Sequence, residues 1–422
     1  MSKITEVKSA LLGDKYYKIE HSSGLTIYLY PKSEYNSKYA IFGTRYGSVN
    51  NAFSLDGGEV KKVPDGIAHY LEHKMFECED GDAFVKYART GANANAYTSF
   101  DKTCYLFSCA ENFDESLEIL LDFVQRPYFT EETVAKEQGI IGQEIRMYDD
   151  SAEWRVMFNM LEKMYRNHPV QLDIAGTVES IAEITPELLY DCYYTFYNLN
   201  NMVLCIAGDL TPEDILKTAD KLLKPCEKHT IENYFEDEPY EVIADYVEQE
   251  FPVSVPLFNL GFKDKAHKVS QKEMAEIEIL IEILTSPSSE LYKILDDKKL
   301  INQSFDSEYF CGQGYNAVFF SGESRNPKDA AEVIKNYISD IKKNGISAEA
   351  FEIARREVYG DAVSALNSVD NIANTMVEFH FNGFDIFGII DDIAACTPDD
   401  GAKRLKAMRD VNNSTLSVVK PQ

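Results

Sequence analysis

The order of predicted elements repeats once along this chain of 422 residues, and this repeat limits the fold more than any other feature. A helical pattern that begins after Thr130 returns after Ser347, a shift of 217 residues, and the strands and helices around each come in the same order. Such a repeat is typical of an internal duplication. The chain is also longer than one hydrophobic core normally serves. We therefore expect two similar modules.

Residue patterns place the elements of each half. In the first half, strands are predicted at 25–30, 39–46, 93–99, 103–110 and 202–207, and helices at 69–76, 83–89, 113–126, 130–148 and 212–223. In the second half, helices are predicted at 270–284, 289–299, 327–343 and 347–367, with two strands within 303–321. Asp65 is the expected N-cap of the first helix. The acidic segment 226–250 is predicted to link a module of residues 1–225 to a module of residues 251–422.

Composition excludes some partners and compartments. The chain has 42 Lys and Arg against 70 Asp and Glu, a net charge of −28, whereas nucleic-acid binding needs a basic face. The acidic charge serves solubility or attracts cationic substrates. We see neither a secretory signal nor the roughly 18 uninterrupted apolar residues of a membrane span. We expect a cytoplasmic protein that contacts neither nucleic acid nor membrane, with most of its eight cysteines reduced.

The most specific local pattern is His69-Tyr70-Leu71-Glu72-His73. On a helix, His69 and His73 are one turn apart on the same face, so their imidazoles can bind one metal ion. Glu72 lies one step round the helix, where it can reach a water on the metal without binding the metal itself. This is the inverted zincin order, His-x-x-Glu-His. It predicts one zinc ion per chain, with Glu72 as general base.

A third zinc ligand is expected elsewhere, because catalytic zinc sites use three protein ligands and keep one open position. Glu137 and Glu144 are two turns apart on one face of the predicted helix 130–148. One can bind the metal while the other accepts a hydrogen bond from a ligand histidine. Their spacing leaves open which glutamate has which role. The 217-residue shift sets Glu137 against Ala354 and Glu144 against Asp361. The second half lacks the histidine motif, so metal chemistry belongs to the first half.

With these residues in place, the sequence resembles the pitrilysin/insulinase family of zinc peptidases, which includes the mitochondrial processing peptidase. The resemblance runs through almost the whole chain. It rests on Asp65–Phe76, Gly91-Ala92, Asn95-Ala96-Tyr97-Thr98, Glu137 with Glu144, His168-Pro169, Gly176, Tyr197–Met202, Gly208-Asp209 and Ser289-Glu290-Leu291-Tyr292. It implies an α/β (α+β) fold of two duplicated modules, each a mostly antiparallel sheet with helices on one face. It also implies that Glu144 binds zinc and that Glu137 supports a ligand histidine.

The resemblance further implies a zinc-dependent endopeptidase or oligopeptidase that hydrolyses peptides or unfolded segments inside a closed chamber. The substrate is expected to add as a strand beside Ala94, Asn95, Ala96 and Tyr97, where small side chains allow close approach. The alternative for this segment is an ordinary protected edge strand. The alternatives for the whole chain are a non-catalytic scaffold subunit and a zinc enzyme of other chemistry, such as an amidase. The filled ligand positions disfavour the first, and the duplicated module disfavours the second.

A partner chain is expected from the same resemblance. Active members of the family place an Arg and a Tyr of a C-terminal module opposite the zinc. Here Asn316 stands where the arginine is expected, and no tyrosine follows at the required spacing. Asn cannot offer the charge-assisted pair that Arg gives a developing oxyanion. We therefore expect a heterodimer with a homologous chain that supplies the Arg and Tyr, with a homodimer as the alternative.

Overall fold

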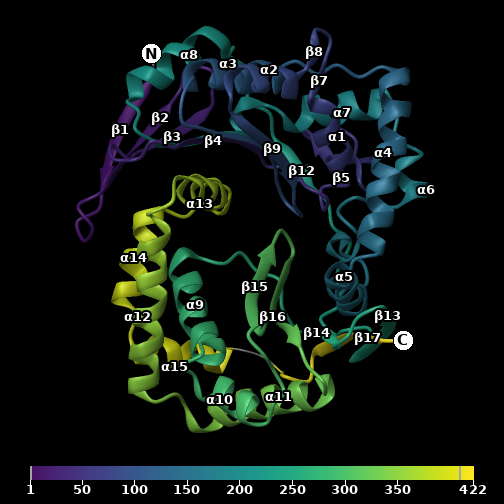
Figure 1. Cartoon of the computed structure of the whole chain (residues 1–422), viewed down its shortest axis with the longest axis vertical. Coiled ribbons are helices and arrows are strands. Elements are labelled where there is room, and N and C mark those ends of the chain that lie inside the picture. Colours follow the sequence, from purple (N-terminus) through teal and green to yellow (C-terminus); the bar gives the residue numbers. More distant parts are fainter. Residues whose placement is uncertain (1, 408–409) are drawn as a thin grey trace. The chain divides into compact units, whose positions relative to one another are not determined.

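The chain forms two compact units, each built around a sheet (Figure 1). The computed structural model describes residues 2–407 and 410–422. The first unit consists of Met1–Ile145, Asp173–Tyr234 and Ser364–Phe387, and the second consists of Arg146–Leu172, Phe235–Val363 and Gly388–Gln422. Each unit therefore takes one segment from the other half of the sequence.

A seven-stranded sheet forms the centre of the first unit. Its strand order is β1 (Lys3–Lys8), β2 (Lys15–Glu20), β3 (Thr26–Pro31), β11 (Met202–Gly208), β4 (Lys38–Thr44), β10 (Thr103–Cys109) and β9 (Asn93–Thr98). Strands β3 and β11 run parallel, and the other neighbours run antiparallel. Every residue of β11 is buried, which agrees with its continuous apolar run. The strands predicted at 93–99 and 103–110 are confirmed as β9 and β10, and they pair antiparallel.

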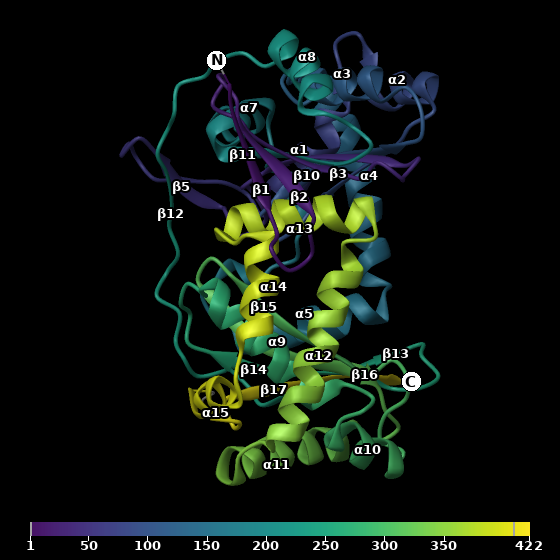
Figure 2. The same cartoon turned by 90° about the vertical axis from the view of Figure 1, so that its left-hand side faces the viewer.

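Helices cover both faces of this sheet. The first unit contains α1 (Ile67–Met75), α2 (Ala83–Thr90), α3 (Phe113–Phe123), most of α4 (Glu131–Asp149), α6 (Val178–Ile181), α7 (Pro186–Phe196), α8 (Pro212–Leu222) and α13 (Val369–Asn382). Its short strands are β5 (Ala52–Leu55), β6 (Lys61–Lys62), β7 (Glu77–Cys78), β8 (Gly81–Asp82) and β12 (Ile231–Asn233). Helices α1 and α3 pack on one face, and α13 packs on the other against β4 and β11 (Figure 2).

The second unit repeats this plan on a smaller scale. Its sheet has the order β13 (Tyr246–Phe251), β17 (Ser414–Pro421), β14 (Leu257–Asp264), β16 (Tyr315–Glu323) and β15 (Asp306–Gly312). Its helices are α5 (Ala152–Met164), α9 (Gln271–Thr285), α10 (Glu290–Asp297), α11 (Pro327–Asn344), α12 (Ala348–Ala365), α14 (Ile386–Ala395) and α15 (Pro398–Ala407), of which α12 and α14 each have a few residues in the first unit. Leu260 and Leu416 belong to the core under α9, α10 and α11, whereas Val419 packs against Val156 of α5.

The five strands of the second sheet match five of the first sheet's seven, which confirms the predicted duplication. The order β3-β11-β4-β10-β9 corresponds to β13-β17-β14-β16-β15, and in each sheet the first two of these strands run parallel. Helices α4 and α12 begin at Glu131 and Ala348, and α5 and α13 begin at Ala152 and Val369; both pairs are 217 residues apart. Helices α5 and α13 are therefore counterparts, and each packs on the sheet of the other half. This exchange was not predicted.

The segment predicted as an acidic linker contains structure. Strand β12 lies within it, and β13 begins at Tyr246 and pairs in parallel with β17. The division at residues 225 and 250 stays a prediction about homologous modules, because the compact units follow the exchanged helices instead. Within residues 2–407 and 410–422, no helix has both the length and the apolar composition of a membrane span.

Candidate metal centre

Helix α1 begins at a glycine that packs tightly against a second loop. Gly66 is the N-cap with φ 87°, and a Cβ at this residue would lie 2.3 Å from the carbonyl oxygen of Ala175. Only glycine fits such a position without strain. The prediction of Asp65 as N-cap is therefore wrong. Asp65 instead accepts hydrogen bonds from Asn51 Nδ2 at its side chain (2.9 Å) and from Ser180 Oγ at its carbonyl (2.9 Å).

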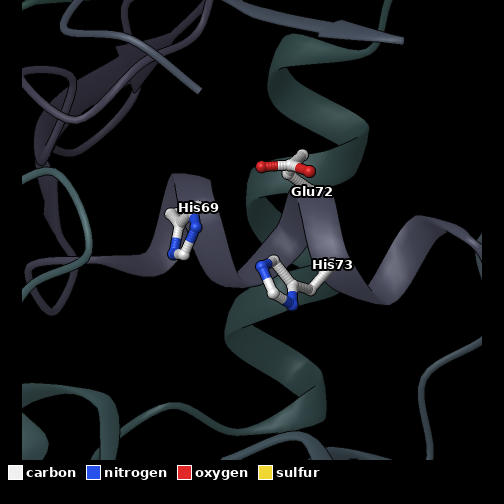
Figure 3. Close-up of side chains that lie close together, drawn as sticks. All are labelled: His69, Glu72 and His73. Carbon is white, nitrogen blue, oxygen red and sulfur yellow. The ribbon is translucent and has the colours of Figure 1, made fainter. Parts of the chain in front are cut away.

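The predicted motif residues project from α1, whose residues are almost all buried (Figure 3). His69 and Glu72 are 7% and 8% exposed. The rings of His69 and His73 lie 4.7 Å apart, centroid to centroid, at 66° to each other. The hydroxyl of Tyr70 donates a hydrogen bond to the carbonyl of Val134, which joins α1 to α4. The structure thus brings the two imidazoles together, as their spacing predicts.

Glu144 on α4 faces the Nε2 atoms of both histidines. Its Oε2 lies 3.2 Å from His73 Nε2, and its Oε1 lies 3.8 Å from His69 Nε2. Two ligand atoms that each lie about 2.1 Å from a tetrahedral zinc ion are about 3.4 Å apart. Two imidazoles and one carboxylate are also a common catalytic zinc set. Both the chemistry and the spacing of these three side chains fit zinc.

Glu137 lies on α4 seven residues, or two turns, before Glu144. It faces the other side of the His73 ring. Its Oε1 lies 3.1 Å from His73 Nδ1. A carboxylate in this place fixes the ring orientation and leaves Nε2 free for a metal. His69 has no such support in the described part of the chain, since its buried Nδ1 has no hydrogen-bond partner there. The assignment of Glu144 as ligand and Glu137 as support stays a prediction, and these distances support it.

The charges of the site depend strongly on burial. Burial, together with the nearby His73, lowers the pKa of His69 to about 4, which keeps this ring neutral as a metal ligand must be. Burial also opposes the charged form of His73, but its hydrogen bonds with Glu137 and Glu144 raise its pKa to about 10. Without a metal, His73 therefore carries the positive charge that these carboxylates attract.

Glu72 has one partner, and it lies on the sheet. Thr98 Oγ1 at the end of β9 donates a hydrogen bond to Glu72 Oε2 at 3.2 Å, the only side-chain hydrogen bond of Glu72 within the described residues. Oε1 thus remains free to take a proton. Burial raises the pKa of Glu72 to about 7, although His73 and Thr98 oppose the rise. Glu72 also lies within 4.8 Å of both histidine rings, so distance alone would allow it to bind a metal.

Strand β9 contains the predicted substrate residues and forms the edge of the first sheet. Across the pair of strands, Tyr97 lies opposite Cys104 and Ala96 lies opposite Tyr105. Side chains alternate along a strand, so Ala94, Ala96 and Thr98 face α1, whereas Asn95 and Tyr97 face α13. Asn95 is exposed, and its Oδ1 accepts a hydrogen bond from the Ala96 amide (2.9 Å). The substrate role of these residues stays a prediction.

Two residues near the site were missed from the sequence. Thr98 belongs to the motif that carries the family resemblance, and strand alternation from Ala96 would have placed it on the face of α1. Asn374 on α13 gave no local signal, because its place depends on which sheet α13 covers.

Asn316, where an arginine was expected, is fully buried in β16 and donates a hydrogen bond to the Tyr309 hydroxyl (2.8 Å).

Comparison with known proteins identifies similar sequences and folds. The family model described as insulinase (peptidase family M16) matches residues 50–178, and the model of the peptidase M16 inactive domain matches residues 183–358. The zinc protease YmfH of Bacillus subtilis (strain 168), described as uncharacterized, is 40% identical over 405 residues, 94% of each chain.

Solved structures agree with these sequence matches. An M16-like peptidase from Alicyclobacillus acidocaldarius is 33% identical and superposes with a TM-score of 0.92 over 100% of this chain and 99% of its own. Pitrilysin, at 15% identity, shares the fold with a TM-score of 0.75, and the match covers 99% of this chain but 46% of the pitrilysin chain. These neighbours confirm the predicted fold class.

Proposed function

Because this chain belongs to peptidase family M16, the insulinase family, we propose that it is a zinc-dependent endopeptidase or oligopeptidase that hydrolyses peptides and unfolded segments. The observation that carries the proposal is the convergence of His69 Nε2, His73 Nε2 and the Glu144 carboxylate, with Glu72 beside them. The similar zinc protease from Bacillus subtilis supports the same reading.

The side chains divide the chemistry between them. A zinc ion held by His69, His73 and Glu144 would supply Lewis-acid chemistry, since it lowers the pKa of a water molecule and polarises a peptide carbonyl. Glu72 takes the proton of the attacking water at Oε1 and passes it to the leaving amine. Thr98 holds Oε2 and so fixes which oxygen acts as the base.

The substrate is proposed to bind as an added strand on the free edge of β9. Ala96 faces α1, so its methyl group leaves room on the side of the metal ligands. Replacement of Ala96 by Phe should raise KM for a peptide by about tenfold or more, because a bulky side chain blocks close approach of the backbone. Zinc content, measured by metal analysis, should stay at one ion per chain. Equal loss of zinc and peptide binding would favour an ordinary structural strand instead.

The experiment that tests the function combines metal analysis with digestion of a peptide library, with and without a chelator. Wild type should bind one zinc and cleave peptides until the chelator removes the metal. Glu72→Gln should keep the zinc and lose turnover by at least about 10³-fold, because the ligands are untouched and the base is gone. Glu131→Gln, an exposed change in the first turn of α4, is the matched control. Full turnover in Glu72→Gln would refute this assignment, and zinc binding without cleavage would favour a scaffold.

We also propose that the chain is half of a two-chain enzyme with a closed chamber. The pitrilysin chain is about twice as long as the part that matches here, and Asn316 offers no charge and is already hydrogen-bonded to Tyr309. A homologous partner would supply an Arg and a Tyr to the substrate carbonyl. To test this, the zinc-loaded chain is assayed alone over a range of concentrations. Ordinary turnover that rises with self-association would exclude the heterodimer and support a homodimer.

A further inference from the structure

Among the described residues, the edge strand β9 is the last strand of its sheet and pairs with β10 alone. Its outer edge must stay free if a peptide is to pair there, so no further strand can hold it. A binding strand that is already fixed loses less conformational freedom when a ligand arrives. Whatever fixes β9 must therefore act from one of its faces.

Helix α13 covers the face of the sheet opposite α1, although it comes from the second half of the chain (Figures 1 and 2). It packs closely on the inner strand β4, next to β11. A Cβ at Gly43 would lie 3.0 Å from Val377 Cγ1 and 3.4 Å from Phe381 Cε2. Val377 is fully buried. The helix is thus fixed against the middle of the sheet, and its polar side chains are held in place over the neighbouring strands.

Asn374 of α13 reaches β9 directly. Tyr97 Oη donates a hydrogen bond to Asn374 Oδ1 at 3.3 Å. The Asn374 Nδ2 atom donates to Tyr39 Oη on β4 at 3.1 Å and to the carbonyl of Asp370 at 2.9 Å. Both donors of the amide and its acceptor are used, so this side chain has one orientation.

A second contact holds the turn that follows β9. Lys102 Nζ pairs with Glu378 Oε2 of α13, and it also lies 3.4 Å from Asp101 Oδ1. The strand is therefore attached to α13 near its end and at the turn beyond it.

We infer that α13 positions β9 for peptide binding, and that Asn374 is a positioning residue that acts through Tyr97. This inference rests on the proposed function. Tyr97 faces α13, whereas its neighbours Ala96 and Thr98 face α1. The hydrogen bond to Asn374 therefore restrains the strand from behind and leaves the face toward the metal ligands clear. Release of Tyr97 would let the outer edge of β9 move more freely, which would weaken peptide pairing there.

The test uses Tyr97→Phe and Asn374→Ala, with Tyr28→Phe as matched control. Tyr28 on β3 also meets α13, through His380 Nδ1 at 3.4 Å, but lies far from β9 in the strand order. In Tyr97→Phe and Asn374→Ala, the β9 amides should exchange hydrogen faster in the metal-free protein. KM for a peptide should rise about 2- to 12-fold, the factor for one hydrogen bond, with a smaller change in kcat and unchanged zinc content. Tyr28→Phe should change neither β9 exchange nor KM.

The double variant separates a shared effect from two independent ones. If Asn374 acts through Tyr97, the double variant should have the KM of either single variant. Additive effects, or unchanged β9 exchange in Tyr97→Phe, would overturn the inference. Wild type that cleaves no peptide would instead refute the proposed function, and the exchange of the metal-free variants would still decide whether α13 anchors β9.

Discussion

The helix pairs α1 with α4 and α9 with α12 correspond in the duplicated fold, yet they carry different charges. The first pair combines two imidazoles with three carboxylates around His73. The second pair presents carboxylates without histidine: Glu282 on α9 lies beside Glu357 on α12, and Ser286 Oγ donates a hydrogen bond to Glu357 at 2.9 Å. Asp361 stands at the position that corresponds to Glu144.

This difference shows what a cluster of carboxylates needs when it is partly buried. In the second unit, burial and the neighbouring Glu357 raise the pKa of Glu282 to about 7, so a proton relieves the repulsion. In the first unit, the two imidazoles could hold a metal ion, whose positive charge would relieve the repulsion between the carboxylates. Among the described residues, His69, Glu72 and His73 form a group of three metal-binding side chains whose ligand atoms lie within 4.8 Å of one another. Both units have carboxylates on these helices. The histidines of the first unit are what give it the ability to bind a metal ion.

Substitutions at the corresponding positions Glu144 and Asp361 should differ most in their effect on zinc binding. Glu144→Gln should weaken zinc binding by more than about 100-fold and abolish peptide cleavage, because a direct ligand should matter more than the outer partners that cost 10- to 100-fold. Asp361→Asn makes the same chemical change in the second unit and should alter neither. Zinc affinity by competition with a chromogenic chelator checks both. Equal loss in the two variants would mean that Asp361 contributes to zinc binding as much as Glu144 does.

The next effect concerns the support of His73. Glu137→Gln should lower zinc affinity by about 10- to 100-fold, because the amide orients the ring less firmly than a carboxylate. Glu132→Gln, an exposed change on the same helix, should leave the affinity unchanged. The same chelator competition measures both variants. Unchanged affinity in Glu137→Gln would remove its supporting role, whereas complete loss of zinc would reverse the roles assigned to Glu137 and Glu144.

A smaller effect is expected at Thr98. Thr98→Val keeps the shape of the side chain but removes the donor to Glu72 Oε2, so kcat should fall by about tenfold, near the lower end of the value of one hydrogen bond to a charged group. Thr98→Ser should restore most of it, and zinc content should stay the same in both. Steady-state kinetics with metal analysis decides the matter. A serine variant as slow as the valine variant would show that the methyl group, not the hydroxyl, matters.

The smallest effect concerns the carboxylate pair Glu282 and Glu357 in the second unit. Folding raises the pKa of Glu282 from 4.5 to about 7. Between these two pH values, Glu282 is therefore protonated in the folded chain and ionised in the unfolded chain. The stability from this pair is therefore intact below about pH 4.5 and is lost as the pH rises through 7. Glu282→Gln should match wild type at pH 4.5 and exceed it by about 1 kcal/mol at pH 8, after allowance for solvent screening.

Urea unfolding at both pH values measures this difference, with the exposed Glu349→Gln on α12 as control. A gain at pH 4.5 as large as that at pH 8 would mean that the two carboxylates do not repel each other in the folded chain.

Local patterns in the sequence were enough to predict most elements and the imidazole pair. Helices α1 to α4 and α9 to α12 lie close to their predicted ranges, because hydrophobic spacing and N-caps act within a few residues. The histidine spacing on α1 acts over one helical turn. The start of α1 was missed because Gly66 is dictated by Ala175, more than 100 residues away in the sequence.

Contacts between distant segments account for the rest. Periodicity shows that α5 and α13 each have an apolar face, but it does not show which sheet that face covers. For the same reason, Asn374 could not be connected with Tyr97. The sequence spacing of Glu137 and Glu144 is the same whichever of them faces the histidine Nε2 atoms, so only a family resemblance could separate their roles.

The exchange of α5 and α13 also has a consequence during synthesis. The strands of the first sheet are complete once residue 208 has been made, but α13, which covers one face, ends at residue 382. At a synthesis rate of about 5–20 residues per second, this face of the sheet stays uncovered for roughly 10–35 s before α13 has been made. Helix α5 stays unpacked for still longer, because β17, on which it packs, lies near the end of the chain. Through that interval the nascent chain exposes apolar surface that the finished protein hides, which makes it a natural client for chaperones at the ribosome.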